Sequence, residues 1–214
     1  MGLYSDHILP RILNWGMGVS FIADERKKAL ADVSGRVLEI GFGSGHNLPY
    51  YSSRVQSVVA IDPSAVSAKL ARKRILMAPF PVEYMPLEGE KIFSPDASFD
   101  SVVSTFTLCT IPDVTAALRQ LRRVLKPDGT FYFLEHGRSP DTAVQRRQNR
   151  LNRFQKRLCG GCNLNRDMKQ LIQDAGFQIS AMETYYGKGP KFTSYLYRGS
   201  ARPATSSSAR SIAS

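Results

Sequence analysis

Short apolar runs recur along the first two thirds of the chain, separated by longer stretches of mixed character. Residues 36–41 and 57–62 are almost wholly apolar and rich in β-branched side chains, which is typical of strands buried on both faces of a parallel sheet. On the same pattern, further strands are predicted at residues 82–85, 100–105 and 130–134.

Two of the intervening stretches place apolar side chains at helical spacing. Residues 65–76 and 113–125 predict amphipathic helices, with Ser64 and Asp113 in the N-cap position. Strands that alternate with helices in this way form right-handed β-α units. The pattern therefore predicts an α/β fold in which helices cover both faces of a doubly wound, Rossmann-like sheet.

The last third of the chain has a different pattern. Residues 167–175 predict a helix that ends at Gly176, and the runs at residues 177–186 and 191–199 are joined by a Gly-Lys-Gly-Pro turn. This spacing predicts a β-hairpin. Residues 200–214 are rich in Ser, Ala and Arg and show no apolar periodicity, so we expect a disordered tail.

The first 30 residues predict a helical segment that precedes the main domain at residues 31–199. Its apolar positions follow one face of a helix and are Ile8, Leu9, Ile12, Trp15, Val19 and Ile22. Such a segment can close over a substrate as a lid, which we favour, or lie on a membrane surface.

Composition agrees with a single domain. The chain has 214 residues and 43% hydrophobic content, which is enough for a sizeable core but not for two full domains. No run of about 18 apolar residues and no signal-peptide pattern occurs. We therefore expect a cytoplasmic protein and leave a peripheral membrane contact open.

The candidate chemistry begins at the sequence VLEIGFGSG, where glycines occupy alternate positions after the first strand. A glycine turn between strand and helix suits a nucleotide-like cofactor. A dinucleotide-binding motif would have Gly or Ala at position 46, where this chain has His46, so a dinucleotide cofactor is disfavoured. Glu39 would repel a pyrophosphate but attract the ammonium and sulfonium of S-adenosylmethionine (SAM). The alternative for Glu39 is a buried, ion-paired carboxylate.

A second carboxylate supports the same cofactor. Asp62 ends the second strand, where it can accept hydrogen bonds from both ribose hydroxyls. The alternative for Asp62 is a helix-capping or loop acid before Pro63. Both acids at this spacing favour a SAM site over a generic nucleotide site.

Residues 36–136 resemble a known family. VLEIGFGSG, AIDPS, FDSVVSTFTLCTIPD and LRRVLKPDGTFYFLEH are similar to the class I SAM-dependent methyltransferases, within the branch of the ubiquinone and menaquinone methyltransferases. The resemblance implies a seven-stranded sheet with one antiparallel strand. It also implies SAM as cofactor and S-adenosylhomocysteine as product.

The resemblance implies roles for individual residues. It places Glu39, Gly41, Gly43 and Gly45 around the methionine part of SAM, Asp62 on the ribose, Glu88 and Gly89 near the adenine, and Thr105 and Phe106 beside the methyl-transfer centre. Asn47 and Pro63 complete the expected cofactor-binding set.

A narrower resemblance extends beyond the cofactor half. TLCTIPD, FYFLEHGRSPD and GGCNLNRDMKQLIQDAGF look like the methyltransferase-like 7 group of thiol S-methyltransferases. This resemblance implies a small, apolar acceptor, with a thiol first and a phospholipid or quinone second. His136 follows the fifth strand and either orients or deprotonates the acceptor or serves as a structural histidine.

Charge and cysteines add two further expectations. The net charge is +11, and nine of the basic residues lie between Arg138 and Lys169. This segment predicts a solvated helix face or a contact with an anionic membrane; nucleic acid is disfavoured because Phe154 is its only aromatic residue.

The cysteines are too few for a disulfide framework. Cys159 and Cys162 have C-x-x-C spacing, but a structural zinc needs two more ligands and the sequence holds no second pair. We therefore expect no metal, and we expect Cys109 to be a core residue.

Overall fold

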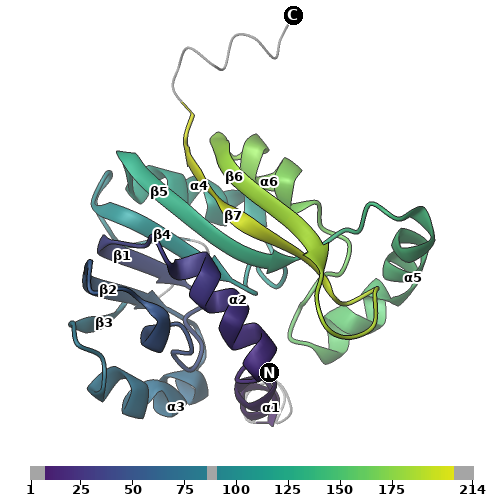
Figure 1. Cartoon of the computed structure of the whole chain (residues 1–214), viewed down its shortest axis with the longest axis horizontal. Helices are drawn as coiled ribbons and strands as arrows, with labels where there is room; N and C mark the ends of the chain where they lie inside the picture. Colours follow the sequence, from purple (N-terminus) through teal and green to yellow (C-terminus); the bar gives the residue numbers. More distant parts are fainter. Residues whose placement is uncertain (1–7, 86–90, 205–214) are drawn as a thin grey trace, which may run out of the picture.

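A single mixed sheet forms the centre of the computed structural model, which describes residues 8–85 and 91–204. Within these ranges the sheet has seven strands in the order β3-β2-β1-β4-β5-β7-β6 (Figure 1). The strands are β1 Gly35–Ile40, β2 Val55–Ile61, β3 Val82–Met85, β4 Phe99–Thr105, β5 Leu125–His136, β6 Phe177–Tyr186 and β7 Tyr195–Pro203. Strand β7 runs antiparallel to both of its neighbours. The predicted sheet, with its antiparallel hairpin, is confirmed.

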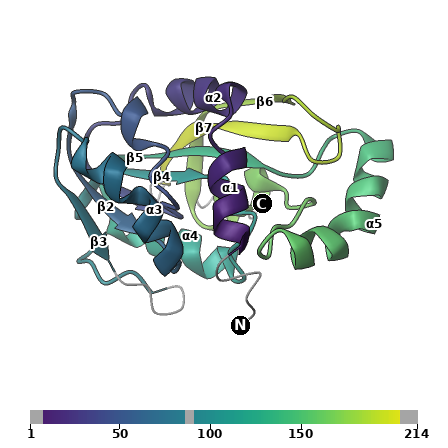
Figure 2. The same ribbon diagram turned by 90° about the horizontal axis from the view of Figure 1, so that it is seen from below.

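Helices cover both faces of the sheet, with α2 on one side and α4 on the other (Figure 2). The helices are α1 Leu9–Gly16, α2 Ser20–Leu30, α3 Ala65–Leu76, α4 Val114–Val124, α5 Thr142–Leu158 and α6 Met168–Asp174, with a short 3-10 turn at Leu48–Tyr50. Two predicted N-caps are confirmed: the side chains of Ser64 and Asp113 each accept a backbone N–H in the first turn of α3 and α4.

The two faces hold separate hydrophobic cores. Helices α4 and α6 place Leu118, Leu121 and Met168 against one face, where Phe131 and Phe133 are fully buried. Leu30 of α2 and Ala71 of α3 pack on the opposite face. Burial of both faces explains why β1 and β2 are apolar almost throughout, rather than alternating.

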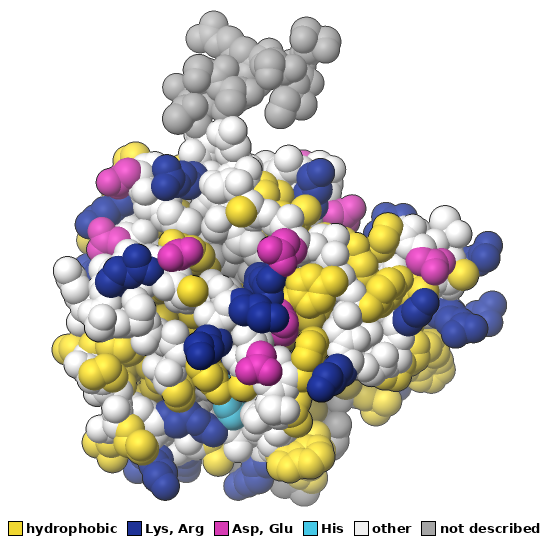
Figure 3. Space-filling view, viewed as in Figure 1, with side chains coloured by type: hydrophobic (Ala, Val, Ile, Leu, Met, Phe, Trp, Pro, Cys, Tyr) yellow, Lys and Arg dark blue, Asp and Glu magenta, His cyan; other side chains and the backbone are white. Residues whose placement is uncertain are grey.

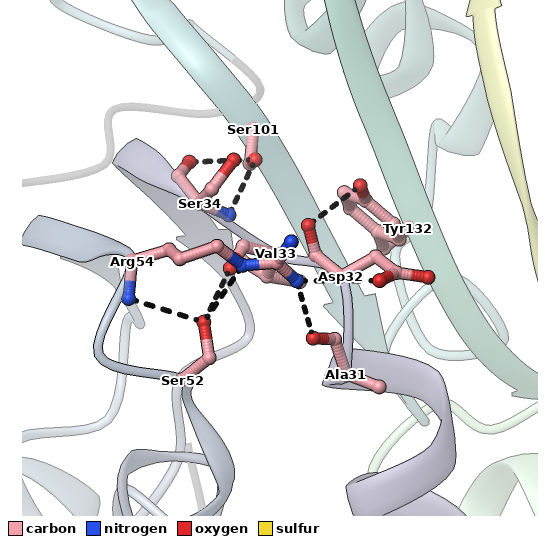
Figure 4. A network of polar contacts seen from close by, with 8 residues as sticks. All are labelled: Ala31, Asp32, Val33, Ser34, Ser52, Arg54, Ser101 and Tyr132. Atoms are coloured by element: carbon pink, nitrogen blue, oxygen red, sulfur yellow. Dashed lines mark hydrogen bonds and ion pairs between the residues drawn. The ribbon is translucent and has the colours of Figure 1, made fainter.

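A polar network fixes the connection from α2 to β1 (Figure 4). Arg54 donates to the carbonyl of Ala31 at 2.7 Å and to the carboxylate of Asp32 at 3.2 Å. The Tyr132 hydroxyl of β5 donates to the carbonyl of Asp32 at 3.0 Å. These contacts satisfy carbonyls at the end of α2 and hold that end against the sheet.

Helix α2 is also attached to the C-terminal hairpin. Glu25 is 4% exposed and accepts hydrogen bonds from Tyr185 of β6 and Arg198 of β7. Lys28 forms a further ion pair with Glu25 at 2.9 Å. Because Tyr185 and Arg198 lie far from α2 in the sequence, their bonds to Glu25 fix the position of α2 across the sheet.

Two chain ends differ from the sequence prediction. The predicted N-terminal segment forms two helices, α1 and α2. The disordered tail is predicted to begin at residue 200, whereas β7 continues to Pro203 because Ala201 pairs with Phe131 and Ile179 and is fully buried. The remainder of the tail, residues 205–214, lies outside the described ranges. Among the described helices, none has the length and apolar character that a bilayer crossing requires.

Candidate active site

The sheet reverses its strand order between β1 and β4, because β2 lies on one side of β1 and β4 on the other. Ligands of open α/β sheets bind at the carboxyl edge of such a switch point. The glycine loop follows β1 there, Asp62 follows β2, and Phe106 follows β4. The predicted site residues within the described ranges therefore meet at one edge.

The glycine loop needs glycine for different reasons at different positions. Gly41, Gly43 and Gly45 all have positive φ, of 69°, 57° and 77°. A Cβ on Gly41 would lie 2.0 Å from the hydroxyl of Thr107, whereas a Cβ on Gly43 would meet nothing closer than a carbonyl oxygen at 3.9 Å. Gly41 therefore allows packing within the protein, and Gly43 leaves space for a ligand to approach the backbone.

Asp62 lies directly beside this loop. Its carboxylate accepts the N–H of Gly43 at 2.7 Å and the N–H of Ser64 at 2.8 Å. Burial raises the pKa of Asp62, although both hydrogen bonds act in the opposite direction. Pro63 is exposed at the same edge. The contact of Asp62 with a ribose stays a prediction, as does the role of Pro63.

Glu39 is buried beneath the loop and is 1% exposed. It accepts hydrogen bonds from the Asn47 amide at 2.8 Å and from the Tyr51 hydroxyl at 2.6 Å. Burial raises the pKa of Glu39 to about 7, against the hydrogen bond from Tyr51 and the positive charge of Arg26. Glu39 is buried, as the alternative expected, but its hydrogen-bond partners are a neutral amide and a hydroxyl and not an ion pair; attraction of a sulfonium stays a prediction.

Arg26 is the central side chain that the sequence analysis misses. It extends from α2, is 5% exposed, and donates to the side chains of Asn47 and Thr105. Its guanidinium lies 5.7 Å from the centre of the Phe106 ring. Within the described part of the chain, its buried Nε has no hydrogen-bond partner, so this donor is unsatisfied by the protein.

The loop after β4 is held in an unusual conformation. Phe106 has a positive φ of 54°, which is strained for a bulky residue. Glu135, fully buried in β5, accepts the backbone N–H groups of Thr107 and Leu108 at 3.0 and 3.1 Å and the Ser104 hydroxyl at 2.7 Å. These bonds stabilise the strained loop, and Glu135 is a second positioning residue that the sequence analysis misses.

His136 lies at the same edge but in a buried environment. Its Nε2 is 3.2 Å from the Sγ of Cys162, and the side chain is 8% exposed. Burial acts against the charged imidazole, but the hydrogen bond and charge of Cys162 outweigh it and raise the pKa of His136. One ring nitrogen of His136 is therefore engaged by a cysteine, and a role of His136 toward an acceptor stays a prediction.

Helix α1 covers the glycine loop. The Ser44 hydroxyl donates to the side chain of Asn14 at 2.7 Å, and a ring nitrogen of His46 lies 3.0 Å from the Asn14 carbonyl. Burial and the charges of Arg74 and Arg26 lower the pKa of His46 to about 4, so its ring is neutral at pH 7. On the outer face of α1, Trp15 is 80% exposed.

Helix α5 extends beyond the edge of the sheet (Figures 1 and 2). Its basic side chains are all exposed: Arg146, Arg147, Arg150, Arg153, Lys156 and Arg157. Lys and Arg side chains are visible at this end of the molecular surface (Figure 3). A solvated basic face is one of the two expectations for this segment. Glu88 and Gly89, predicted near the adenine, lie outside the described residues.

Comparison with known proteins identifies the family. The model of the family described as "Methyltransferase domain" matches residues 38–133. The phosphatidylethanolamine N-methyltransferase of Cereibacter sphaeroides is 33% identical over 141 residues, which cover 62% of this chain and 68% of that protein. The chain belongs to the class I SAM-dependent methyltransferases. The predicted family, cofactor and enzyme class are confirmed.

Two further relatives extend the comparison. Human thiol S-methyltransferase TMT1A is 33% identical over 148 residues, covering 66% of this chain and 59% of that protein. The chain thus spans less than two thirds of the length of several curated relatives. A SAM-dependent methyltransferase structure from Thermotoga maritima has a TM-score of 0.63 and 21% identity, covering 91% of this chain and 98% of that chain, which supports the fold.

The described residues fit SAM as the methyl donor. The open space above Gly43 admits a ligand next to the backbone, and Asp62 stands at the loop as a hydrogen-bond acceptor. The buried Nε of Arg26 is a donor without a protein partner, as a carboxylate-bearing ligand requires.

Replacing each glycine by alanine should separate folding from ligand binding. Gly43→Ala places a methyl group in open space, so we expect a cost of about 1–2 kcal/mol from its positive φ together with loss of SAM binding. Gly41→Ala should destabilise the protein further because of the collision with Thr107. Urea unfolding and SAM calorimetry measure the two effects, and unchanged SAM affinity in Gly43→Ala would contradict the assignment.

The raised pKa of Glu39 has a measurable consequence for stability. Between its ordinary value of 4.5 and about 7, the unfolded chain has lost this proton while the folded protein retains it, so stability falls as pH rises. Relative to Glu39→Gln, the wild type should lose up to about 3 kcal/mol over this interval. Urea unfolding at several pH values measures the difference, and parallel pH profiles would count against it.

Proposed function

We propose that this SAM-dependent methyltransferase transfers its methyl group to the sulfur of a small, apolar thiol. The observation that carries the proposal is that the fold brings together the segments that resemble thiol S-methyltransferases. The loop after β4, the end of β5 and residues 159–166 contribute Cys109, His136 and Cys162 to one cluster beside the carboxyl edge. The comparison with thiol S-methyltransferase TMT1A supports this choice.

In this proposal the donor side is built from the glycine loop and α2. Asp62 binds the ribose, Gly43 allows close approach of the methionine part, and the free Nε of Arg26 binds the methionine carboxylate. A charge-assisted hydrogen bond in a buried site is both strong and directional. Arg26 also contacts Thr105 at 2.8 Å, so the same side chain aligns donor and acceptor halves.

The reaction is an in-line displacement. The thiol first loses its proton to solvent. An ordinary thiol has a pKa of about 8.5, and nearby positive charge lowers this pKa. A sulfur lone pair of the thiolate forms the new S–C bond, and the pair of the breaking S–C bond stays on the sulfur of S-adenosylhomocysteine. The protein holds the two sulfurs and the methyl carbon in line and excludes water.

A site that excludes water favours the reaction of an anionic thiolate with a cationic sulfonium. An anionic thiolate and a cationic sulfonium give two neutral sulfur groups, so removing water raises the energy of the reactants relative to the transition state. Methylation of an amine instead moves the positive charge onto the acceptor. The buried surroundings of Thr105 and Arg26 therefore suit a thiolate better than an amine.

A phospholipid acceptor is the second candidate. The exposed Ile12 and Trp15 of α1 and the basic face of α5 can meet an anionic membrane surface. The similarity to phosphatidylethanolamine N-methyltransferase supports this alternative. Here α1 would lie on the membrane, whereas in the thiol proposal it closes over the cofactor.

Release of S-adenosylhomocysteine from SAM tests the choice directly. Purified protein would be given benzyl mercaptan, hydrogen sulfide, a quinol, or vesicles of phosphatidylethanolamine with anionic lipid. We expect turnover with benzyl mercaptan and none above background with benzyl alcohol, its oxygen counterpart. Turnover on vesicles or quinol, without turnover on thiols, would replace the proposal with the membrane alternative.

A further inference from the structure

The fold supplies the ligands that the C-x-x-C segment lacks in sequence. Cys109 follows β4, His136 ends β5, and Cys162 lies between α5 and α6. One ligand atom from each lies within 4.8 Å of the other two, and all three side chains are buried. Two residues distant in the chain are thus brought to Cys162.

We propose that Cys109, His136 and Cys162 bind a zinc ion. Two cysteine sulfurs and one imidazole nitrogen are a donor set that zinc prefers. Charge supports the same metal, because a buried cation must be neutralised by its ligands. Two thiolates balance a divalent cation, and the imidazole adds no charge.

The ligand atoms already lie close to one another without a metal. The Nε2 atom of His136 is 3.2 Å from the Sγ atom of Cys162, and the sulfur of Cys109 completes the cluster. Zinc binds cysteine as the thiolate, so its binding would release the thiol protons.

Surrounding hydrogen bonds hold the ligand-bearing backbone in place. Asn163 donates to the carbonyl of Cys109 from its backbone at 2.8 Å and from its side chain at 3.0 Å. Arg166 donates to the carbonyls of Leu108 and Ile111. Such outer contacts orient metal ligands and reduce the rearrangement that binding requires.

Tetrahedral zinc needs one more ligand, and two sources can supply a thiolate. Cys159 is half-buried and is joined to Cys162 by two glycines with positive φ of 59° and 93°. Its sulfur is not one of the three clustered atoms. The other source is the thiol acceptor; this part rests on the proposed function. Arg166, whose charge acts on both Cys109 and Cys162, offsets the additional negative charge.

Metal content of the purified chain tests the site. The protein is prepared under reductant with zinc supplied, dialysed, and measured by mass spectrometry of zinc and by protein concentration. We expect equimolar zinc in the wild type and in Cys159→Ser, and loss of zinc in Cys109→Ser and Cys162→Ser. SAM affinity measured on the same samples shows whether each variant has folded.

A wild-type chain that retains no zinc would overturn the site, as would unchanged zinc content in a folded Cys162→Ser variant. If thiol turnover persists in a protein that never binds zinc, the proposed function stands and the metal site falls. If the protein binds equimolar zinc but does not turn over thiols, the metal site stands and the proposed function falls.

Cobalt in place of zinc identifies the fourth ligand, because each cobalt–thiolate bond adds charge-transfer absorbance. If Cys159 is the ligand, Cys159→Ser should lower this absorbance by about one third, since one of three thiolates is lost. If the acceptor is the ligand, adding benzyl mercaptan should raise the absorbance in both proteins. If the absorbance changes neither in Cys159→Ser nor on addition of benzyl mercaptan, the proposal of a fourth ligand that is a thiolate is overturned.

Discussion

The architecture of the site depends on the hydrogen bonds that the buried guanidinium of Arg26 donates to Asn47 and Thr105. Burying a cation is costly unless hydrogen bonds and opposite charge compensate it. Asn47 and Thr105 accept its hydrogen bonds, and Glu39 lies one residue further along the network through Asn47. Because Asn47 follows β1 and Thr105 ends β4, these bonds join the two loops of the topological switch point to α2.

Helix α2 therefore links parts of the molecule that are far apart in sequence. Its Glu25 contacts the hairpin through Arg198 and Tyr185, and the next residue, Arg26, contacts the loops at the switch point. Tyr132 and Arg54 fix its C-terminal end. Helix α2 thus contacts both the hairpin and the carboxyl edge of the sheet, and a displacement of α2 would alter the contacts at both places.

Local patterns were sufficient to predict the sheet, the hairpin, two helix caps and the glycine loop. These features depend on neighbouring residues or on periodicity, which are visible in one sequence. Arg26 could not be found in this way, because in ADERKKAL it resembles the solvated lysines beside it. Likewise, C-x-x-C spacing near Cys162 gave no sign of Cys109 and His136, since only the β4–β5 pairing brings those strand ends together. Strand β7 extends past residue 199 because it pairs with β5 and β6. A Ser- and Arg-rich sequence gives no local sign of this pairing.

The most direct test of this account is calorimetry of two ligands on wild type and Arg26→Met. SAM carries the methionine carboxylate, and 5′-methylthioadenosine lacks it while keeping the adenosine and sulfur. If Arg26 binds that carboxylate, the substitution should weaken SAM binding about 10- to 100-fold more than it weakens binding of 5′-methylthioadenosine, because SAM alone loses a charge-assisted hydrogen bond in addition to any disturbance of the loops. Equal weakening of both ligands, or no weakening of SAM, would contradict the account.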